Sequence, residues 1–271
     1  MHELLQNPAP GALVLDIGCA EGSFDSTNTQ FIAIRIDLER GGVPGANFAQ
    51  ADAAKLPFPD NCFAVVISNH SLEHFEDLAA ALAEIGRVIR PNGALYVGAP
   101  DASTVSDRLY RWMSRGGGHV NPFYSSGELA IRIERATGLR HRATRTLCTS
   151  FCFLNRKNRR SRPPKRLLLL GGGSETVLFL LNYVAGLADR FLKTRMSVYG
   201  WALYFGEIGA PVDCRTWTNV CIRCGSGYSS DWLHDRRLVR RFLSLFTYRC
   251  PHCKALNPLK IDKDYDHFEK I

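Results

Sequence analysis

The chain has 271 residues, 45% of them hydrophobic, so it can bury a substantial core and fits one full domain with an appendage. Its formal net charge is +8, with dense basic blocks at residues 155–166 and 236–241. No uninterrupted apolar run reaches membrane-spanning length and no signal-peptide pattern opens the sequence, which excludes a spanning chain and leads us to expect a cytoplasmic protein.

Strand-like apolar runs alternate with helical patterns through the first half of the chain. We expect strands at 13–17, 31–36, 47–51, 63–68 and 94–99. The clearest helix is expected at 76–90, where apolar residues recur every three or four positions until Pro91-Asn92-Gly93 ends the pattern. This alternation predicts an α/β fold with a mostly parallel, Rossmann-like sheet.

The second half continues the pattern and then departs from it. A helix is expected at 125–137, with Ser125 as N-cap and Gly138 as C-cap signal, followed by a strand at 139–147. A basic and then apolar insertion at about 148–196 precedes a last strand at 197–206. We place a domain boundary near 210, which gives a domain at 1–210 and a module at 211–271.

The stretch VLDIGCAEGSF (14–24) places a glycine-containing turn after the first strand. A dinucleotide fingerprint needs G-x-G-x-x-G, but Gly18 is followed by Ala20 and Ser23 at the other two positions, so a nicotinamide cofactor is disfavoured. A second pattern fits better, in which Asp16 precedes Gly18 and small residues follow at alternate positions up to Gly22.

With the segments that follow it, this turn resembles the class I S-adenosylmethionine (SAM)-dependent methyltransferases, and among them the type 11-like domain. The segments are AD (51–52), LPFPDNCF (56–63), VVISNHSLEH (65–74), EIGRVIRPNG (84–93) and GGHVNPFYSSGEL (117–129), so the resemblance covers roughly residues 13–147. It implies a seven-stranded sheet, SAM as cofactor and methyltransferase activity.

The resemblance also implies a role for each matching residue. Asp16 would order the turn and face the methionine amino group, while Asp37 would accept both ribose hydroxyl protons. Asp52 would receive the adenine amino group. The complete implied cofactor set is Asp16, Gly18, Cys19, Ala20, Gly22, Asp37, Leu38, Asp52, Ala53 and Asn69. A structural alternative stays open, since Asp16 could cap the turn and Asp37 could begin a loop.

Three histidines are candidates for acid–base chemistry. His70 and His74 look like bases, but the LEH segment usually packs the next helix in this pattern, so we favour a structural role for both. His119 follows the fifth strand, over the expected position of the cofactor methyl group, and is the candidate catalytic residue. Packing and catalysis are equally open for His119.

Two helices of the usual domain are nearly absent. Eight residues separate Gly22 from Phe31, and residues 39–46 leave no room for a normal helix. That side of the sheet is expected to be uncovered, or covered by the insertion, the cysteine-rich tail or another subunit of a homo-oligomer. The N-terminal helices are reduced to MHELLQNPAPG, so substrate contacts are expected from 101–200.

Paired cysteines at CIRC (221–224) and CPHC (250–253) predict a zinc ribbon. Its ligands would be Cys221, Cys224, Cys250 and Cys253, and the Zn²⁺ would be structural because four thiolates leave no position for a catalytic water. Cys214 is a substitute ligand, and the packing candidates are Cys19, Cys62, Cys148 and Cys152. The alternative is a set of four unrelated buried cysteines.

The sequence narrows the molecule that would receive the methyl group only to a broad chemical class. The segment SNHSLEH lacks the Asn/Asp-Pro-Pro-aromatic signature of methylation on base amino groups, which favours O- or C-methylation of a small-molecule, sugar or lipid-linked acceptor. Basic clusters and the ribbon keep nucleic acid open as an RNA substrate, and a non-catalytic scaffold in a larger complex is a third alternative. The segment 155–190 could make peripheral membrane contact or form a solvated hinge.

Overall fold

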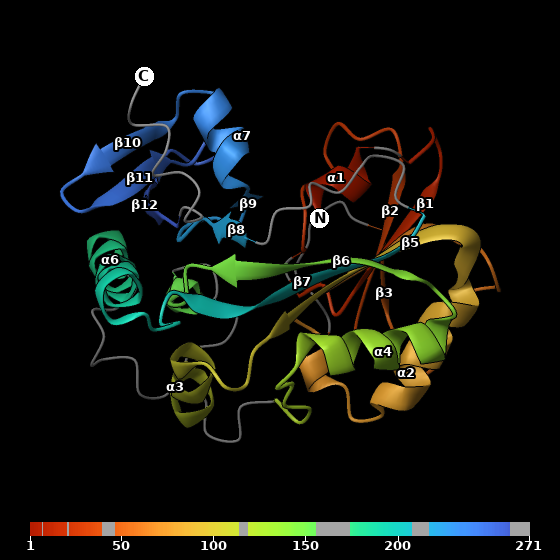
Figure 1. Cartoon of the computed structure of the whole chain (residues 1–271). Coiled ribbons are helices and arrows are strands. Elements are labelled where there is room, and N and C mark those ends of the chain that lie inside the picture. Colours follow the sequence, from red (N-terminus) through yellow and green to blue (C-terminus); the bar gives the residue numbers. More distant parts are fainter. Residues whose placement is uncertain are drawn as a thin grey trace. The chain divides into compact units, whose positions relative to one another are not determined.

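The computed structural model describes residues 1–6, 8–20, 22–39, 47–113, 119–155, 174–207 and 217–260. The chain divides into two compact units. The first comprises residues 1–102, 118–144 and 201–214, and the second comprises 103–117, 145–200 and 215–271. Figure 1 shows the helices and strands of both.

The first unit is built on five parallel strands. They are β1 (Leu13–Ile17), β2 (Ile32–Asp37), β3 (Asn47–Gln50), β4 (Phe63–Asn69) and β5 (Ile89–Pro100). Their order in the sheet is β3-β2-β1-β4-β5, and all four pairings between them are parallel. Parallel pairing brings the carboxyl ends of all five strands to one edge.

Two later strands, β7 (Val198–Gly206) and β6 (His141–Cys148), follow β5 in the sheet. The Gly206 N–H donates to the Arg140 carbonyl at 2.9 Å, and the Glu207 N–H donates to the Gly93 carbonyl at 3.0 Å. The end of β7 therefore lies beside the beginnings of β5 and β6, so β7 runs antiparallel to them. The predicted mostly parallel, Rossmann-like sheet is confirmed.

The predicted number of seven strands is wrong, because the sheet has nine. In the second unit, β8 (Trp217–Val220) pairs in parallel with β6 at Thr146–Cys148, and β9 (Gly227–Tyr228) pairs antiparallel with β8. An edge strand leaves backbone N–H and C=O groups without partners. The cysteine module supplies these partners to β6, which the spacing of its cysteines alone could not reveal.

Two helices, α2 (Leu78–Val88) and α4 (Ser126–Thr137), lie side by side on one face of this sheet in Figure 1. Asp77 caps α2 by accepting the Ala80 N–H at 2.9 Å. Ser125 caps α4, which ends at Gly138 with a φ of 71°. Both helices predicted here exist, within two residues of the expected bounds.

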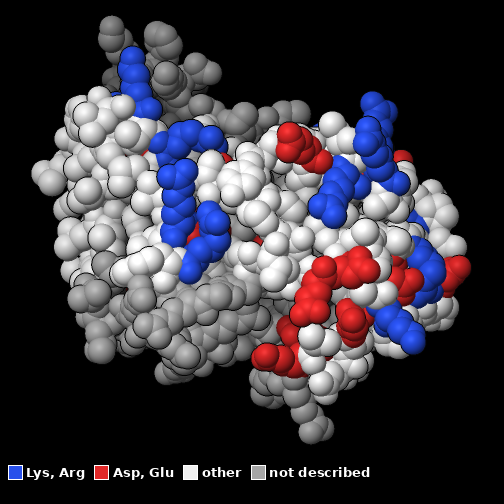
Figure 2. Space-filling view, turned by 90° about the horizontal axis from the view of Figure 1, so that it is seen from below, with Lys and Arg blue, Asp and Glu red and all other residues white. Residues whose placement is uncertain are grey.

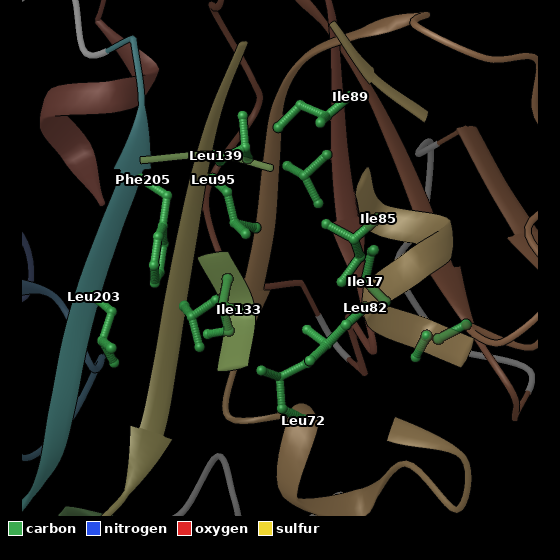
Figure 3. Packing of buried hydrophobic residues seen from close by; sticks show 14 of the residues in the cluster. Ile17, Leu72, Leu82, Ile85, Ile89, Leu95, Ile133, Leu139, Leu203 and Phe205 are labelled. Atoms are coloured by element: carbon green, nitrogen blue, oxygen red, sulfur yellow. The ribbon is translucent and has the colours of Figure 1, made fainter. Parts of the chain in front are cut away.

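The core of the first unit lies between these helices and the sheet. Figure 3 shows Leu82 and Ile85 of α2 pointing toward Ile17 of β1 and Ile133 of α4. The 3₁₀ helix η1 (Leu72–His74) adds Leu72, which is fully buried, to the same cluster. Burying such a side chain contributes about 1.5–3 kcal/mol. The residues that directly follow β4 are thereby fixed to the core.

The predicted absence of a helix between the first two strands is confirmed for residues 18–20 and 22–31, which form turns and bends. Phe24 and Phe31 fill part of this space with their rings 6.0 Å apart. Arg35 of β2 lies over the Phe24 ring at 5.4 Å and donates to the Phe24 carbonyl at 2.8 Å. The second shortened connection falls on residues 40–46, outside the described residues. The N-terminal helix α1 (His2–Leu5) has four residues.

The second unit combines the insertion with the cysteine module. Its helices are α3 (Val105–Met113), which the sequence reasoning did not predict, α6 (Glu175–Leu192), α7 (Ser230–Asp235) and the 3₁₀ helix η2 (Cys152–Leu154). Its strands β10 (Val239–Phe242), β11 (Leu245–Arg249) and β12 (Leu256–Leu259) form an antiparallel sheet in that order. Among the described residues, no helix combines the length and apolar character needed to cross a bilayer.

The insertion and the cysteine module share a core. Leu178 and Ala185 of α6 pack in one cluster with Phe151, Leu154 and Ile222. Helix α6, which lies in the expected domain 1–210, therefore packs on the expected module 211–271 within one compact unit, and the boundary near 210 stays a prediction. The boundary itself, Cys214 and all of the first basic block except Asn155 lie outside the described residues.

Candidate functional site

The implied cofactor residues share one edge of the sheet. Gly18, Cys19 and Ala20 follow β1, Asp37 ends β2 and Leu38 follows it, Asp52 and Ala53 follow β3, and Asn69 ends β4. The pairings of these four strands are parallel. Ligands of open α/β sheets bind at this edge, outside the carboxyl ends of the strands. The fold thus brings the sequence-predicted residues to the place where a cofactor can bind.

Asp16 is buried and holds the turn. Its Oδ2 accepts the Ser23 N–H at 2.9 Å and lies 3.6 Å from Nε of Arg35. Its Oδ1 has no hydrogen-bond partner among the described residues. Burial raises the pKa of this carboxyl, although Ser23 and Arg35 act in the opposite direction. A buried carboxylate oxygen that can still accept a hydrogen bond suits a cationic amino group, bound either directly or through a water molecule.

Gly18 lets two strand ends approach closely. Its φ is +63°, and a Cβ at this position would lie 2.5 Å from the Cβ of Ser71. Ser71 follows β4, and its Oγ donates to the Ile17 carbonyl at 3.0 Å. A side chain at residue 18 would therefore separate the end of β1 from the segment that follows β4.

The rest of the turn is tied to β2 by its backbone. The Cys19 N–H donates to the Ile36 carbonyl at 3.0 Å, and the Ala20 N–H donates to Oδ2 of Asp37 at 2.8 Å. Gly22, with a φ of +96°, donates to the Cys19 carbonyl at 2.6 Å. Burial raises the pKa of the Cys19 thiol to about 12, so this side chain stays neutral and packs.

Asp37 keeps acceptor capacity at both oxygens. Oδ2 accepts from Ala20, and Oδ1 accepts the Glu39 N–H at 3.2 Å. Each carboxylate oxygen can take a second donor, such as a ribose hydroxyl. Leu38 beside it is 67% exposed, which leaves an apolar surface next to the carboxylate.

The ends of β2 and β3 are joined by two hydrogen bonds. The Ala51 N–H donates to the Asp37 carbonyl at 3.0 Å, and Nε2 of Gln50 donates to the Leu38 carbonyl at 2.9 Å. Asp52 follows directly, with an exposed side chain whose Oδ1 accepts the Ala54 N–H at 2.9 Å. The expected ribose and adenine residues therefore lie on adjoining segments.

Sequence reasoning missed two buried charged residues near this edge, Arg35 and Glu73. Arg35 is 3% exposed and Glu73 is 1% exposed. Arg35 connects Asp16 to the segment that replaces the missing helix. Its sequence signal is a single charge inside the otherwise apolar strand FIAIRI. A charge in a buried strand requires a specific partner, which here is Asp16.

Glu73 is surrounded by all three candidate histidines. Its Oε1 lies 3.7 Å from Nδ1 of His70, 4.0 Å from Nε2 of His74 and 4.0 Å from Nε2 of His119. The rings of His74 and His119 are 4.9 Å apart. Burial raises the pKa of Glu73, but the nearby imidazoles of His70, His74 and His119 lower it by more, so the net shift is downward.

Asn121 fixes the loop that carries His119. Its side-chain amide donates to the carbonyls of Leu72 at 3.2 Å and Phe75 at 2.7 Å, and its N–H donates to the Glu73 carbonyl at 3.1 Å. His119, in the predicted loop after β5, is therefore held against the segment that follows β4. The side chain of His119 is 9% exposed.

The four paired cysteines converge in the second unit. Their sulfurs all lie within 4.8 Å of one another, with 3.5 Å between Cys221 and Cys253 and 3.6 Å between Cys224 and Cys250. None of these four cysteines forms a disulfide. A tetrahedral Zn²⁺ with Zn–S bonds of about 2.3 Å places its sulfurs about 3.8 Å apart. The cluster therefore fits a four-thiolate zinc ion.

The two cysteine pairs have the same backbone geometry. The Gly225 N–H donates to the Cys221 carbonyl at 3.0 Å, and the Lys254 N–H donates to the Cys250 carbonyl at 2.8 Å. Both donors have positive φ, 76° and 64°. In addition, Nδ2 of Asn257 lies 3.6 Å from Sγ of Cys221. This repeated turn around clustered sulfurs disfavours four unrelated cysteines.

Residues 15–97 match a protein family described as a methyltransferase domain. The mouse Probable tRNA methyltransferase 9B is 32% identical over 105 residues, which are 36% of this chain and 24% of that protein. Malonyl-[acyl-carrier protein] O-methyltransferase of Serratia marcescens is 28% identical over 146 residues, 48% of this chain and 57% of that protein. The chain spans less than two thirds of the length of each relative.

Solved structures support the same fold. The complex between the Haloferax volcanii Trm112 methyltransferase activator and a methyltransferase gives a TM-score of 0.50 at 17% identity, covering 77% of this chain and 88% of that chain. A methyltransferase from an antibiotic biosynthesis pathway of Anabaena variabilis gives a TM-score of 0.50 at 18% identity, covering 74% of this chain and 93% of that chain. The match of residues 15–97 and the shared fold agree with the predicted class I methyltransferase domain.

Proposed function

We propose that the chain, with its class I methyltransferase domain, transfers a methyl group from SAM to an oxygen or carbon of a small-molecule, sugar or lipid-linked acceptor. The observation that carries this proposal is the convergence of the Asp16 turn and the Asp37 carboxylate at the carboxyl edge of a sheet whose residues 15–97 match the domain family. Each carboxylate also accepts a backbone N–H, as the structural alternative predicts, so the family match of residues 15–97 is what favours a cofactor role.

The proposed cofactor contacts follow the strand ends. Asp16 offers its spare Oδ1 toward the methionine amino group, and Asp37 offers both oxygens to the ribose hydroxyls. The exposed Leu38 would provide apolar contact for adenine beside Asp52, and Ala53, whose side chain is buried, would contribute its backbone. Asn69 ends β4 at the methionine side of the site.

SAM, when bound, supplies a methyl group that the sulfonium already activates. The protein then mainly needs to align the acceptor atom with the carbon–sulfur bond that breaks. Residues on the acceptor side are proposed to come from the segments after β4 and β5, where Glu73, His74 and His119 meet. Acceptor chemistry would then belong to this cluster rather than to His119 alone.

An apolar surface in the second unit favours a lipid-linked acceptor within the proposed classes. On α6, Leu180, Val184, Phe191 and Leu192 are 53%, 58%, 66% and 74% exposed. Leu243, after β10, is 75% exposed, and Arg190 of α6 donates to the Ser244 carbonyl next to it. Apolar side chains with nearby basic residues are typical of surfaces that contact anionic lipid.

Vesicle flotation tests this lipid preference. The full chain should float with vesicles containing anionic phospholipid, and Phe191→Ser/Leu192→Ser should weaken that binding while leaving SAM binding unchanged. Binding that is equal for the variant and the wild type would contradict a contact through α6.

RNA is less favoured than these acceptors, although one relative carries tRNA methyltransferase in its name. Affinity for RNA rests on many contacts of Lys and Arg with phosphates. On the face shown in Figure 2, the described Lys and Arg side chains form separate groups, and most Asp and Glu side chains lie beside one of these groups. The segment SNHSLEH, which lacks the Asn/Asp-Pro-Pro-aromatic signature of methylation on base amino groups, is therefore the ground for favouring the other acceptors.

Calorimetry with SAM and its demethylated product tests the enzyme proposal. We expect binding by the wild-type chain and at least tenfold weaker binding by Asp37→Ala, with the exposed Asp60→Ala as a matched control of unchanged affinity. The absence of heat with either ligand would favour the non-catalytic scaffold. Labelled SAM with lipid, sugar, small-molecule and RNA acceptors would then identify the acceptor class.

We also propose that Cys221, Cys224, Cys250 and Cys253 hold a structural Zn²⁺. Because a metal-bound cluster folds with its ion, removal of zinc should unfold part of the second unit. Native mass spectrometry should find zinc that Cys224→Ser/Cys253→Ser loses, whereas Cys62→Ser retains it. Full zinc retention by the double variant would contradict this assignment.

A further inference from the structure

The proposed cofactor site leaves out a cluster of three side chains that can ligate a metal ion, which are Glu73, His74 and His119. The three ligand atoms, one carboxylate oxygen and two imidazole nitrogens, lie within 4.8 Å of one another. They come from two segments, η1 after β4 and the loop after α3, which Asn121 holds together. His70 adds a third imidazole at 3.7 Å from Oε1 of Glu73.

The carboxylate of Glu73 is buried with incomplete hydrogen bonding. Its distances of 3.7–4.0 Å to the three imidazole nitrogens exceed ordinary hydrogen bonds of about 2.7–3.2 Å. Its second oxygen, Oε2, is buried and has no hydrogen-bond partner in the described part of the chain. A buried carboxylate costs several kcal/mol unless a cation or strong donors compensate it.

We propose that Glu73, His74 and His119 bind a divalent transition-metal ion at the acceptor side of the methyl-transfer site, a site separate from the cysteine cluster. Ligands at about 2.1 Å from a tetrahedral ion are about 3.4 Å apart. The two 4.0 Å distances from Oε1 of Glu73 need to shorten by about 0.6 Å, which small side-chain rotations provide.

The donor set indicates which ions fit. Two imidazoles and one carboxylate on one side of an ion suit Mn²⁺, Fe²⁺, Co²⁺ or Zn²⁺, whereas Mg²⁺ and Ca²⁺ prefer oxygen ligands alone. Three protein ligands also leave coordination positions open, unlike the four thiolates of the ribbon. The open positions can accept an oxygen from another molecule.

The proposed use of this site rests on the proposed methyl transfer. A hydroxyl of the acceptor that binds the ion loses its proton to water more easily, because a metal lowers the pKa of a bound hydroxyl. The resulting oxygen uses a lone pair to bond the methyl carbon. The carbon–sulfur bond of SAM breaks, and its electrons stay on sulfur. The acceptor would accordingly carry a hydroxyl group and be methylated on oxygen.

Mn²⁺ tests the site because it favours nitrogen and oxygen over thiolate ligands. Electron paramagnetic resonance of Mn²⁺ added to the full chain carrying one equivalent of zinc, enough for the four thiolates alone, should show one bound ion per chain. Glu73→Gln and the more exposed His74→Gln should each weaken this binding at least tenfold, the lower end of the loss seen even for outer-shell partners of metal ligands. His141→Gln, which alters a histidine outside the cluster, should bind as the wild type does.

The outcomes separate the metal site from the methyltransferase proposal. Circular dichroism and calorimetry with SAM on the same variants report folding and cofactor binding independently of Mn²⁺. Two results would overturn the metal site: a wild-type chain that fails to bind Mn²⁺, or folded Glu73→Gln and His74→Gln chains that bind it with unchanged affinity. Loss of SAM binding by the wild type would instead refute the proposed function.

Discussion

Replacement of Gly18 by alanine tests the turn that the proposed cofactor site depends on. The φ of +63° makes any L side chain strained, and the new Cβ would lie 2.5 Å from the Cβ of Ser71. The positive φ alone should lower the free energy of unfolding of the alanine variant by about 1 kcal/mol. Overlap with a well-packed neighbour adds about 1–3 kcal/mol, so Gly18→Ala should lower the free energy of unfolding by about 2–4 kcal/mol.

Gly138 provides a matched control. Its φ of +71° is nearly the same, but a Cβ there would meet nothing within 4 Å. Gly138→Ala should therefore cost only the conformational part, about 1 kcal/mol. Urea unfolding of both variants measures the difference, and calorimetry should show at least tenfold weaker SAM binding for Gly18→Ala alone. Equal destabilisation with unchanged SAM affinity would refute the close-approach argument.

Two further substitutions test buried charges. Arg35→Met leaves the buried Asp16 without its ion-pair partner and should lower the free energy of unfolding by about 3–5 kcal/mol in urea; a loss under about 1 kcal/mol would contradict the pairing. Asp189→Asn weakens hydrogen bonds from Ser197 and Lys260 and should cost about 1–3 kcal/mol at neutral pH. Burial raises the pKa of Asp189, but Ser197 and Lys260 lower it by more, so its net pKa shift is downward. The stabilisation that ionised Asp189 provides is therefore fully present above the unfolded pKa of about 3.9 and is lost as the pH falls through the lower folded pKa. The unfolding free energies of the variant and the wild type should consequently converge only in acid.

The fold of the first unit was largely predictable because its signals are local. Alternating apolar runs and caps such as Ser125 and Gly138 depend on residues a few positions apart. The strand number was not predictable in this way. Pairing of β8 with β6 joins residues about seventy positions apart, and the sequence between them does not encode which edge the module will meet.

The candidate site shows the same division between local and distant signals. The positions of Asp16 and Asp37 at strand ends followed from the motif, whereas the Ala20 N–H as a partner of Asp37 required the folded turn. Glu73 was read as part of a packing segment. Three histidines surround Glu73 only because the loop carrying His119, 46 residues later in the sequence, packs against it, and sequence periodicity cannot detect such a distant contact.

Hydrogen–deuterium exchange of the full chain, with and without saturating SAM, tests the central claim most directly. If SAM binds at the carboxyl edge of the sheet, peptides covering 14–20, 35–39, 50–54 and 66–71 should gain protection together. Peptides from 217–260 should exchange at the same rate in both states. Protection confined to 217–260, or unchanged exchange at all four strand ends, would contradict the account.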